Sequence, residues 1–258
     1  MNINEFISTL PSEIVLGKEL NISSNVFRKL FVFGGLSRED IFYYLNFGNN
    51  YNALSIAKKE FNVKEVYGIY NIEESSGKQD KDIKKIGINI LNKRISDIDL
   101  SNATVIFCWV SDINHSRDLI IKFEEELKKN ARILTLFSPL GSILPVKVSF
   151  PFILSKKPFH YATDIKEQIK KIYGKECIDF TSSWLLSEKY VKEMEIDPKY
   201  SRFTIMLMSM ILWINAWNLK ITCEEIIPPP VESYQGILRT FFNIDLKDMF
   251  VDKDKVNT

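Results

Sequence analysis

Short apolar runs alternate with amphipathic stretches along the first half of the chain. The runs are rich in β-branched and aromatic residues and end at turn residues, whereas the stretches between them repeat apolar side chains at helical spacing. Because strand, turn and helix repeat in this order, the pattern predicts an α/β fold with a doubly wound, mostly parallel sheet. The predicted strands lie at 40–45, 66–70, 88–91, 103–110 and 132–137, and the predicted helices lie at 53–61, 78–86 and 117–129.

The same pattern divides the chain into three parts. Residues 1–30 are a predicted helical lead-in with Ser23 or Ser24 as a helix cap, residues 31–150 form the α/β domain, and residues 151–258 form a mainly helical extension. The extension is a possible interaction region. Its predicted helices lie at 164–173, 187–195, 203–217 and 233–243, and the three prolines at 228–230 predict a stiff extended spacer.

Two apolar segments of the extension are candidates for contact with a protein partner or with a second copy of the chain. The run from Phe203 to Trp217 (FTIMLMSMILWINAW) spans only about 22 Å as a helix, against a hydrocarbon core of roughly 30 Å. It therefore favours a buried or interface helix over a membrane span. The segment from Ser233 to Phe242 carries aromatic and aliphatic residues at helical spacing, which suits docking on a partner or on its own domain.

Composition and charge narrow the classes of function. The chain has 258 residues, 34 basic against 33 acidic, and a net charge of +1, so no strong overall field attracts nucleic acid or anionic membrane. Cys108, Cys177 and Cys223 are far apart, and neither His115 nor His160 has metal-ligand spacing with them. The sequence therefore predicts no disulfide framework and no metal site. The N-terminal stretch lacks the pattern of a signal peptide, and we expect a cytoplasmic protein.

Three blocks between Glu39 and Leu140 resemble class I, seven-strand methyltransferases, which use S-adenosylmethionine (SAM). The nearest likeness is to archaeal protein-lysine methyltransferases, and it covers about two-fifths of the chain. The resemblance implies a Rossmann-like fold with a SAM site at the loop after the first strand. The blocks are EDIFYYLNFGNNYNALSIAKKEFNVKEVYGIYNI, DIDLSNATVIFCWV and FEEELKKNARILTLFSPL.

The positions that bind the cofactor in this family are altered in this chain. Tyr44 stands where the family has an acid at the end of the first strand, and Asn46, Gly48 and Asn50 occupy the three glycine positions. Tyr70 replaces the acid that binds the cofactor ribose. Asparagine tolerates left-handed backbone and so preserves the shape of the loop, but its side chain fills space that glycine leaves empty. The loop is either an altered ligand pocket or a plain strand-to-helix turn, and we predict an eroded SAM site with no bound cofactor.

The region after the fourth strand lacks the Asn-Pro-Pro-Tyr motif of amide and base methyltransferases. It holds Trp109, Ser111, Asp112 and Asn114, of which Asp112 and Asn114 either line a substrate mouth or cap the following helix. The chain contains no P-loop, nucleophile elbow or HExxH motif, so hydrolase and kinase functions have no support. We predict no catalytic residue.

Three hypotheses of function follow. The favoured one is a pseudoenzyme: a non-catalytic, methyltransferase-like subunit or interaction module of a larger complex. The second is an active SAM-dependent methyltransferase that acts on protein lysine, which needs a donor and an aligned lysine amine but little acid–base machinery. The third is a nucleic-acid-associated module with Lys156, Lys157 and the basic residues of 166–175 as its footprint.

Overall fold

The computed structural model describes residues 22–47, 50–70, 86–108, 113–247 and 250, without the side chains of 113–116. The chain divides into two compact units. The unit that contains the sheet lies within Lys18–Gln168, and the described part of the helical unit begins at Ile169. The sheet-containing unit thus runs past residue 150, where the sequence pattern had placed the end of the α/β domain. Gly48 and the predicted helix at 78–86 lie wholly or mostly outside the described residues.

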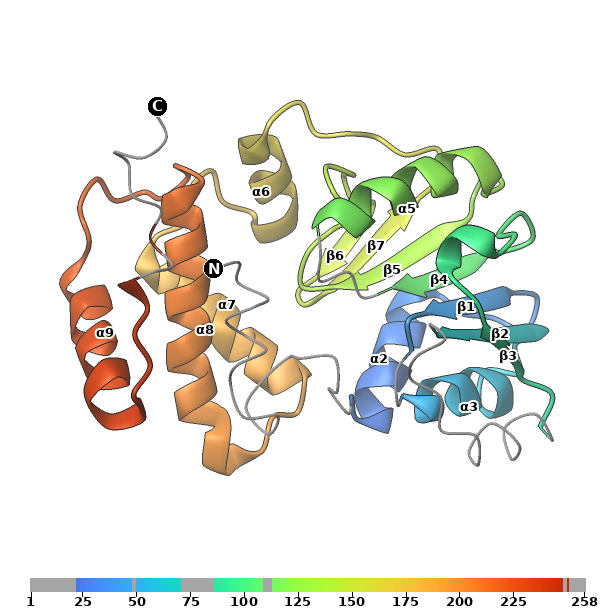
Figure 1. Ribbon diagram of the computed structural model, residues 1–258, viewed down its shortest axis with the longest axis horizontal. Coiled ribbons are helices and arrows are strands. Elements are labelled where there is room, and N and C mark those ends of the chain that lie inside the picture. The colour runs from blue at the N-terminus through green and yellow to red at the C-terminus, as the bar shows by residue number, and fades with distance from the viewer. Residues whose placement is uncertain (1–21, 48–49, 71–85, 109–112, 248–249, 251–258) are drawn as a thin grey trace. The chain divides into compact units, whose positions relative to one another are not determined.

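The sheet has seven strands in the order β3-β2-β1-β4-β5-β7-β6 (Figure 1). The first five strands in the chain pair in parallel, while β7 is antiparallel to both β5 and β6. The predicted α/β fold with a doubly wound, mostly parallel sheet is therefore confirmed. The strands are β1 (Ile41–Leu45), β2 (Glu65–Tyr70), β3 (Asn89–Asn92), β4 (Val105–Cys108), β5 (Arg132–Leu136), β6 (Lys147–Ser149) and β7 (Phe152–Lys156).

Helices cover both faces of this sheet (Figure 1). On one face, Phe27 of α2 packs edge-on against Tyr44 and Phe107, and Phe31 packs against Phe42. On the other face, α5 belongs to a core cluster with the alternate residues of β1 and β4. The two faces alternate along each strand because successive strand side chains point in opposite directions. The covering helices are α2 (Ser24–Gly34), α3 (Tyr51–Lys59) and α5 (Ile113–Glu126), and a short 3-10 helix, η2 (Ile95–Asp97), follows β3.

Asp40 ties together the edge of the sheet at which β1, β4 and β5 begin. Its carboxylate accepts hydrogen bonds from the Ser37 backbone at 2.8 Å and the Thr104 hydroxyl at 2.7 Å, and it pairs with Arg132. The Arg132 guanidinium also donates to the carbonyl oxygens of Gly34 and Gly35 at the end of α2. Burial raises the pKa of Asp40, but the bonds from Arg132, Thr104 and Ser37 outweigh it and hold the pKa below its ordinary value.

The helical unit is built around one long apolar helix. It consists of α6 (Ile165–Tyr173, which crosses the unit boundary), α7 (Phe180–Glu193), α8 (Pro198–Asn218) and α9 (Pro229–Phe242). The predicted helix from Phe203 to Trp217 lies inside α8, and its side chains form most of the core of this unit. No helix among the described residues is long and apolar enough to cross a membrane.

Two predictions for the helical unit were wrong: the start of one helix and the conformation of the three prolines. Helix α7 begins at Phe180 and not near residue 187, because the Asp179 carboxylate caps it by accepting the Ser182 backbone N–H at 2.6 Å. The prolines at 228–230 do not form an extended spacer. Pro228 is the cap of α9 and Pro229 is its first residue, since a proline in the first helical turn sacrifices no intrahelical hydrogen bond.

The expectation that the cysteines form no disulfide was wrong for one pair. Cys177 and Cys223, 46 residues apart, are joined with their Cα atoms 5.1 Å from each other. Cys108 is free and buried in β4. The pairing is a tertiary contact between the start of α7 and the segment after α8, and a wide spacing in sequence carries no signal of it.

The Asp40 network generates a pH-dependent prediction. We expect Asp40→Ala to lower the free energy of unfolding at pH 7 by about 3 kcal/mol, because it leaves Arg132 without its charged partner in a mostly buried site. Because the pKa of Asp40 is lower in the folded protein than in the unfolded chain, where it is about 3.9, the ionised carboxylate stabilises the fold at higher pH. This contribution is lost as the pH falls through the pKa of Asp40 in the folded protein. The difference between wild type and variant, measured by urea unfolding, should therefore shrink below about pH 4.

The exposed neighbour Glu39 provides the matched control. Glu39→Ala should leave the unfolding midpoint unchanged at pH 7 and at pH 3, because a surface ion pair contributes little to stability. An equal loss for Asp40→Ala at pH 7 and at pH 3 would contradict the electrostatic role of Asp40.

Candidate functional site

The candidate site lies where the strand order reverses. β1 pairs with β2 on one side and with β4 on the other, so connections leave the sheet in opposite directions at the carboxyl ends of β1 and β4. In doubly wound sheets ligands bind in the crevice at this point, against the N-terminus of the helix that follows the first strand. The loop after β1 and the beginning of α3 are therefore the place to look for a site.

The predicted site residues fall into different environments. Tyr44 is 2% exposed and points into the layer beneath α2, while Asn50 is 8% exposed at the start of α3. Asn46 has a φ of 53°, the left-handed geometry expected for this glycine position, and its side chain is exposed to solvent. Tyr70 is the last residue of β2 and is nearly buried. The structure thus brings Tyr44, Asn50 and Tyr70 to one region and leaves Asn46 at the surface.

Asn50 makes two contacts that a glycine there could not make. Its side chain is hydrogen-bonded to Tyr44, and its Oδ1 atom accepts the backbone N–H of Ile22 at 3.2 Å. Burial raises the pKa of the Tyr44 phenol well above its ordinary value, and the bond to Asn50 only partly opposes this effect. Tyr44 is therefore a neutral residue of the core, and it supplies no charge to a ligand.

Phe47 is the residue of this loop that the sequence analysis missed. Its side chain is fully buried, and its ring centroid lies 5.0 Å from that of Tyr51 and 5.7 Å from that of Tyr70. It also packs over Gly68 of β2, where an added Cβ atom would lie 2.9 Å from the Phe47 ring. Four aromatic rings, including Tyr44, therefore gather at the carboxyl ends of β1 and β2. A phenylalanine inside a glycine- and asparagine-rich turn was the available signal.

The segment before α2 lies against the start of α3. The Ile22 backbone is held on both sides: its N–H donates to Asn50, and its carbonyl oxygen accepts from Asn52 Nδ2 at 3.0 Å. Asn52 Oδ1 accepts the Ala53 N–H, one of the donors that the first turn of a helix offers to a ligand. We call residues 22–23, which precede α2, the N-terminal strap. The strap is thus held against the start of α3 by the side chains of two asparagines, and Asn52 also accepts one backbone N–H of the first turn of α3.

The strand ends carry no acid among the described residues. β1, β2 and β3 end at Leu45, Tyr70 and Asn92. A ribose is held best by a carboxylate, which accepts hydrogen bonds from both hydroxyl groups with the benefit of charge. Tyr70 offers one neutral hydroxyl on a ring that packs against Phe47. At the described ends of β1, β2 and β3 the polar side chains are therefore those of Tyr70 and Asn92, and neither is a carboxylate.

Other candidates of the sequence analysis are settled only in part. Trp109, Ser111 and Asp112 lie outside the described residues, and Asn114 lies in the first turn of α5. Two residues of the proposed nucleic-acid footprint have partners within the chain. Lys157 donates to the carbonyl oxygens of Phe123 and Glu124 at the end of α5, and Lys170 pairs with Glu176 at 2.7 Å. No group of three or more histidine, cysteine or acidic residues suited to a metal occurs in the described parts of the chain.

Comparisons with known proteins show a similar fold and nothing finer. No family model matches the chain, and no curated protein sequence matches it. A solved RNA methyltransferase from Salinibacter ruber, in complex with S-adenosyl-L-homocysteine, is 16% identical, covers 55% of this chain and 97% of its own, and has a TM-score of 0.48. A putative tRNA (m1A22) methyltransferase from Streptococcus pneumoniae, in complex with S-adenosyl-L-methionine, is 12% identical over 72% of this chain and 98% of its own, with a TM-score of 0.42.

A SAM-dependent methyltransferase from Thiobacillus denitrificans, in complex with S-adenosyl-L-homocysteine, is also similar. It is 12% identical, covers 94% of this chain and 92% of its own, and has a TM-score of 0.38. At these identities and scores the likenesses carry no argument about the activity of this chain.

The close packing of Phe47 on β2 generates a prediction. We expect Gly68→Ala to lower the free energy of unfolding by about 2 kcal/mol, because its Cβ atom would meet Leu54 at 2.6 Å and Phe47 at 2.9 Å in a filled core. Gly236→Ala in α9 is the control, since nothing lies within 4 Å of its added Cβ atom, and it should stabilise by about 0.5 kcal/mol. Chemical unfolding of both variants tests the packing. A neutral Gly68→Ala would show that there is free space beside Phe47.

Proposed function

We propose that this chain is a methyltransferase-like protein that binds no SAM and transfers no methyl group. We propose further that it acts as a subunit or interaction module of a larger complex. The observation that supports the proposal is the filling of the switch point by the chain itself. Phe47 and Tyr70 pack together there, and Asn50 binds the N-terminal strap. A ligand at this position would have to displace buried aromatic contacts.

The loss of the ribose acid adds to this steric argument. A hydrogen bond to a charged group contributes roughly 1.5–3 kcal/mol, against about 1 kcal/mol for a neutral one. Replacing the carboxylate by the Tyr70 hydroxyl therefore lowers affinity about tenfold or more, even if the ring turns toward the ligand. The acid at the end of the first strand is also missing, since Tyr44 is a buried neutral phenol. Tight binding of SAM is not expected from such a site.

The exposed apolar residues of the helical unit support the proposed role as a subunit. α9 buries Val231 and Leu238 against its own unit and leaves Ile237, Phe241 and Phe242 exposed. Phe241 is 76% exposed, and a group of exposed apolar side chains is typical of an interaction site where a single one is not. The predicted contact segment from Ser233 to Phe242 therefore retains an apolar face for a protein partner or a second copy. The segment from Phe203 to Trp217 contributes mainly to the core of the unit.

One observation favours the second candidate function, an active SAM-dependent methyltransferase acting on protein lysine. Asn46 keeps the left-handed backbone that a glycine provides at this position in the family the sequence resembles. The turn thus retains its conformation while the side chains around it differ. Donor binding is the property that separates this candidate from the proposed pseudoenzyme.

Isothermal titration of the purified chain with SAM and with S-adenosylhomocysteine tests the proposal. We expect no saturable heat up to about 1 mM ligand, the weak end of the affinity scale, because the site is filled and lacks its acids. A SAM-dependent methyltransferase of known affinity, titrated in the same buffer, confirms that the ligands are intact. Binding at micromolar concentration would overturn the proposal.

Tyr70→Phe is the matched variant for a positive result. The substitution removes only the hydroxyl group and keeps the ring that packs against Phe47. If wild type binds SAM and Tyr70→Phe binds several-fold more weakly, Tyr70 contacts the ribose and the active methyltransferase replaces the pseudoenzyme as the better account.

A further inference from the structure

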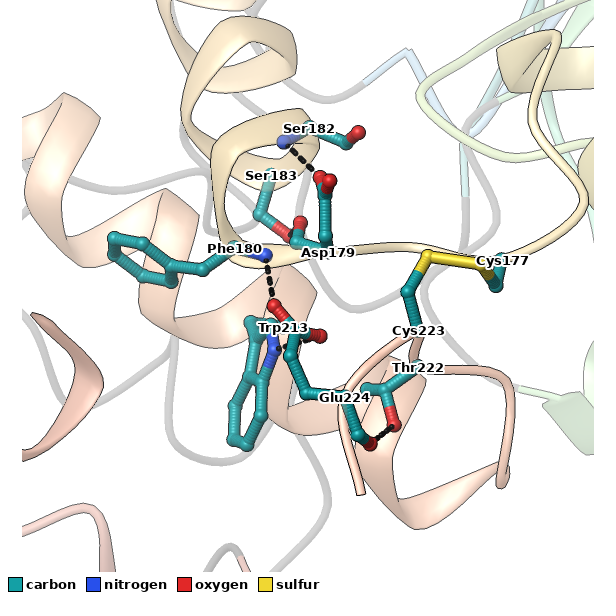
Figure 2. The surroundings of a disulfide bond; sticks show 9 residues. All are labelled: Cys177, Asp179, Phe180, Ser182, Ser183, Trp213, Thr222, Cys223 and Glu224. Atoms are coloured by element: carbon teal, nitrogen blue, oxygen red, sulfur yellow. Dashed lines mark hydrogen bonds between the residues drawn. A yellow bond between two sulfur atoms is a disulfide. The ribbon is translucent and has the colours of Figure 1, made fainter. Parts of the chain in front are cut away.

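The disulfide joins the start of α7 to the segment that follows α8 in the helical unit (Figure 2). Cys177 comes two residues before Asp179, the cap of α7, and Cys223 lies in the segment between α8 and α9. Between the two cysteines, Ile178 and Thr222 form an isolated parallel bridge. The Ile178 N–H donates to Ile221 at 2.9 Å, and the Cys223 N–H donates to the Ile178 carbonyl oxygen at 3.3 Å. These two backbone bonds and the disulfide hold the segment after α8 against the start of α7.

Glu224, the residue after Cys223, accepts two hydrogen bonds at this junction. Its Oε1 atom accepts the backbone N–H of Phe180, the first residue of α7, at 2.9 Å. Its Oε2 atom accepts the indole N–H of Trp213 at 3.2 Å, and Trp213 is fully buried in the core of the unit (Figure 2). A carboxylate at a helix N-terminus is stabilised by the helix dipole. Glu224 therefore connects the start of α7 to the C-terminal half of α8.

Both cysteines of the disulfide have solvent-accessible surface. Cys223 is exposed and Cys177 is half-buried, whereas the free Cys108 is buried in the sheet-containing unit. Thiol–disulfide exchange requires that a thiolate reach one sulfur atom along the S–S axis, so access governs which disulfides respond to reductants. This crosslink is thus placed at the surface while the contact that it positions reaches the core.

We propose that the Cys177–Cys223 disulfide is a redox-sensitive latch, whose reduction releases Glu224 from the start of α7 and from Trp213. The reductant is a dithiol, either a small molecule or a protein with two neighbouring cysteines. Closure of the latch orders the first turn of α7 and the segment 219–226. Opening of the latch loosens both, while the core around α8 stays folded.

The chemistry balances as an ordinary exchange. A thiolate of the dithiol attacks the sulfur of Cys223, the S–S bond breaks, and Cys177 leaves as a thiolate that takes a proton. The second thiolate of the reductant then attacks the first sulfur of the reductant, which is bonded to Cys223 in the mixed disulfide. Cys223 leaves as a thiolate and is protonated. The chain gains two electrons and two protons, and the dithiol is oxidised to a disulfide.

The remaining contacts explain why opening stays local. The core of the helical unit is formed largely by apolar residues of α8 and α9 such as Leu207, Ile211 and Leu238, which lie outside the junction. The segment 219–226 is joined to the start of α7 by the two backbone bonds of the Ile178 bridge, the Glu224 contact, the disulfide and the packing of Ile221 with Ile178 in a small buried cluster. Loss of the crosslink removes its restraint on the open state of this segment and makes opening more frequent.

Hydrogen exchange of the full chain, followed by mass spectrometry with and without dithiothreitol, tests the latch. We expect the peptides 177–184 and 219–226 to exchange at least about tenfold faster after reduction, because their amides lose the junction. Peptides from the middle of α8 and from β4 should not change. Titration of thiols after denaturation should find one thiol per chain before reduction and three after it, since the chain has three cysteines.

Two pairs of variants separate the crosslink from the carboxylate. The double variant Cys177→Ser/Cys223→Ser should match the reduced wild type and show no response to dithiothreitol. In the oxidised protein, Glu224→Ala should speed exchange at 177–184, whereas Glu225→Ala, at an exposed neighbouring residue, should not.

Three results would overturn the proposal. Unchanged exchange in both peptides once three thiols are titrated would show that the crosslink orders nothing. Loss of protection throughout α7, α8 and α9 would show a structural disulfide in place of a local latch. Three thiols in protein equilibrated with oxidised glutathione would show that the disulfide does not form.

Discussion

The burial of β1 on both faces is the constraint on which the sheet-containing unit depends. Phe42 and Tyr44 point into the layer of α2, and Tyr43 and Leu45 belong to the core that includes α5. In the middle of a sheet covered on both sides, neither set can be polar without a partner. A carboxylate at position 44 would have to be desolvated, whereas a neutral phenol needs only the hydrogen bond that Asn50 supplies.

The same constraint shapes the edge where a ligand would bind. Tyr44 extends the apolar layer to the end of β1, and Phe47, three residues further along the chain, continues this layer and packs its ring onto β2. Asn50 then satisfies both Tyr44 and the N-terminal strap. Tyr44, Phe47 and Asn50 thus support one another as parts of one packed structure, and this agreement is the reason for proposing that the chain binds no SAM. The helical unit has a separate core around Trp213, so its contacts do not depend on this edge.

The elements that depend on apolar periodicity were predictable from the sequence, and the contacts that depend on tertiary pairing were not. The strands β4 and β5 lie inside their predicted runs, and Asn46 has the left-handed backbone expected at its position. The inward turn of Phe47 leaves no periodic signal, because it occurs within a turn. The strap is held through the Ile22 backbone, which any residue could provide. The pairing of Cys177 with Cys223 depends on how α7 and α8 pack, so the spacing of the cysteines misled.

The most direct test of the account is a crystal structure of the chain grown in millimolar S-adenosylhomocysteine. The account predicts no ligand density at the carboxyl ends of β1 and β2, with Phe47 packed against Tyr70 and the Ile22 backbone bound by Asn50 and Asn52. The contradicting result is S-adenosylhomocysteine at this edge, with the Tyr70 ring turned toward the ribose and the strap displaced.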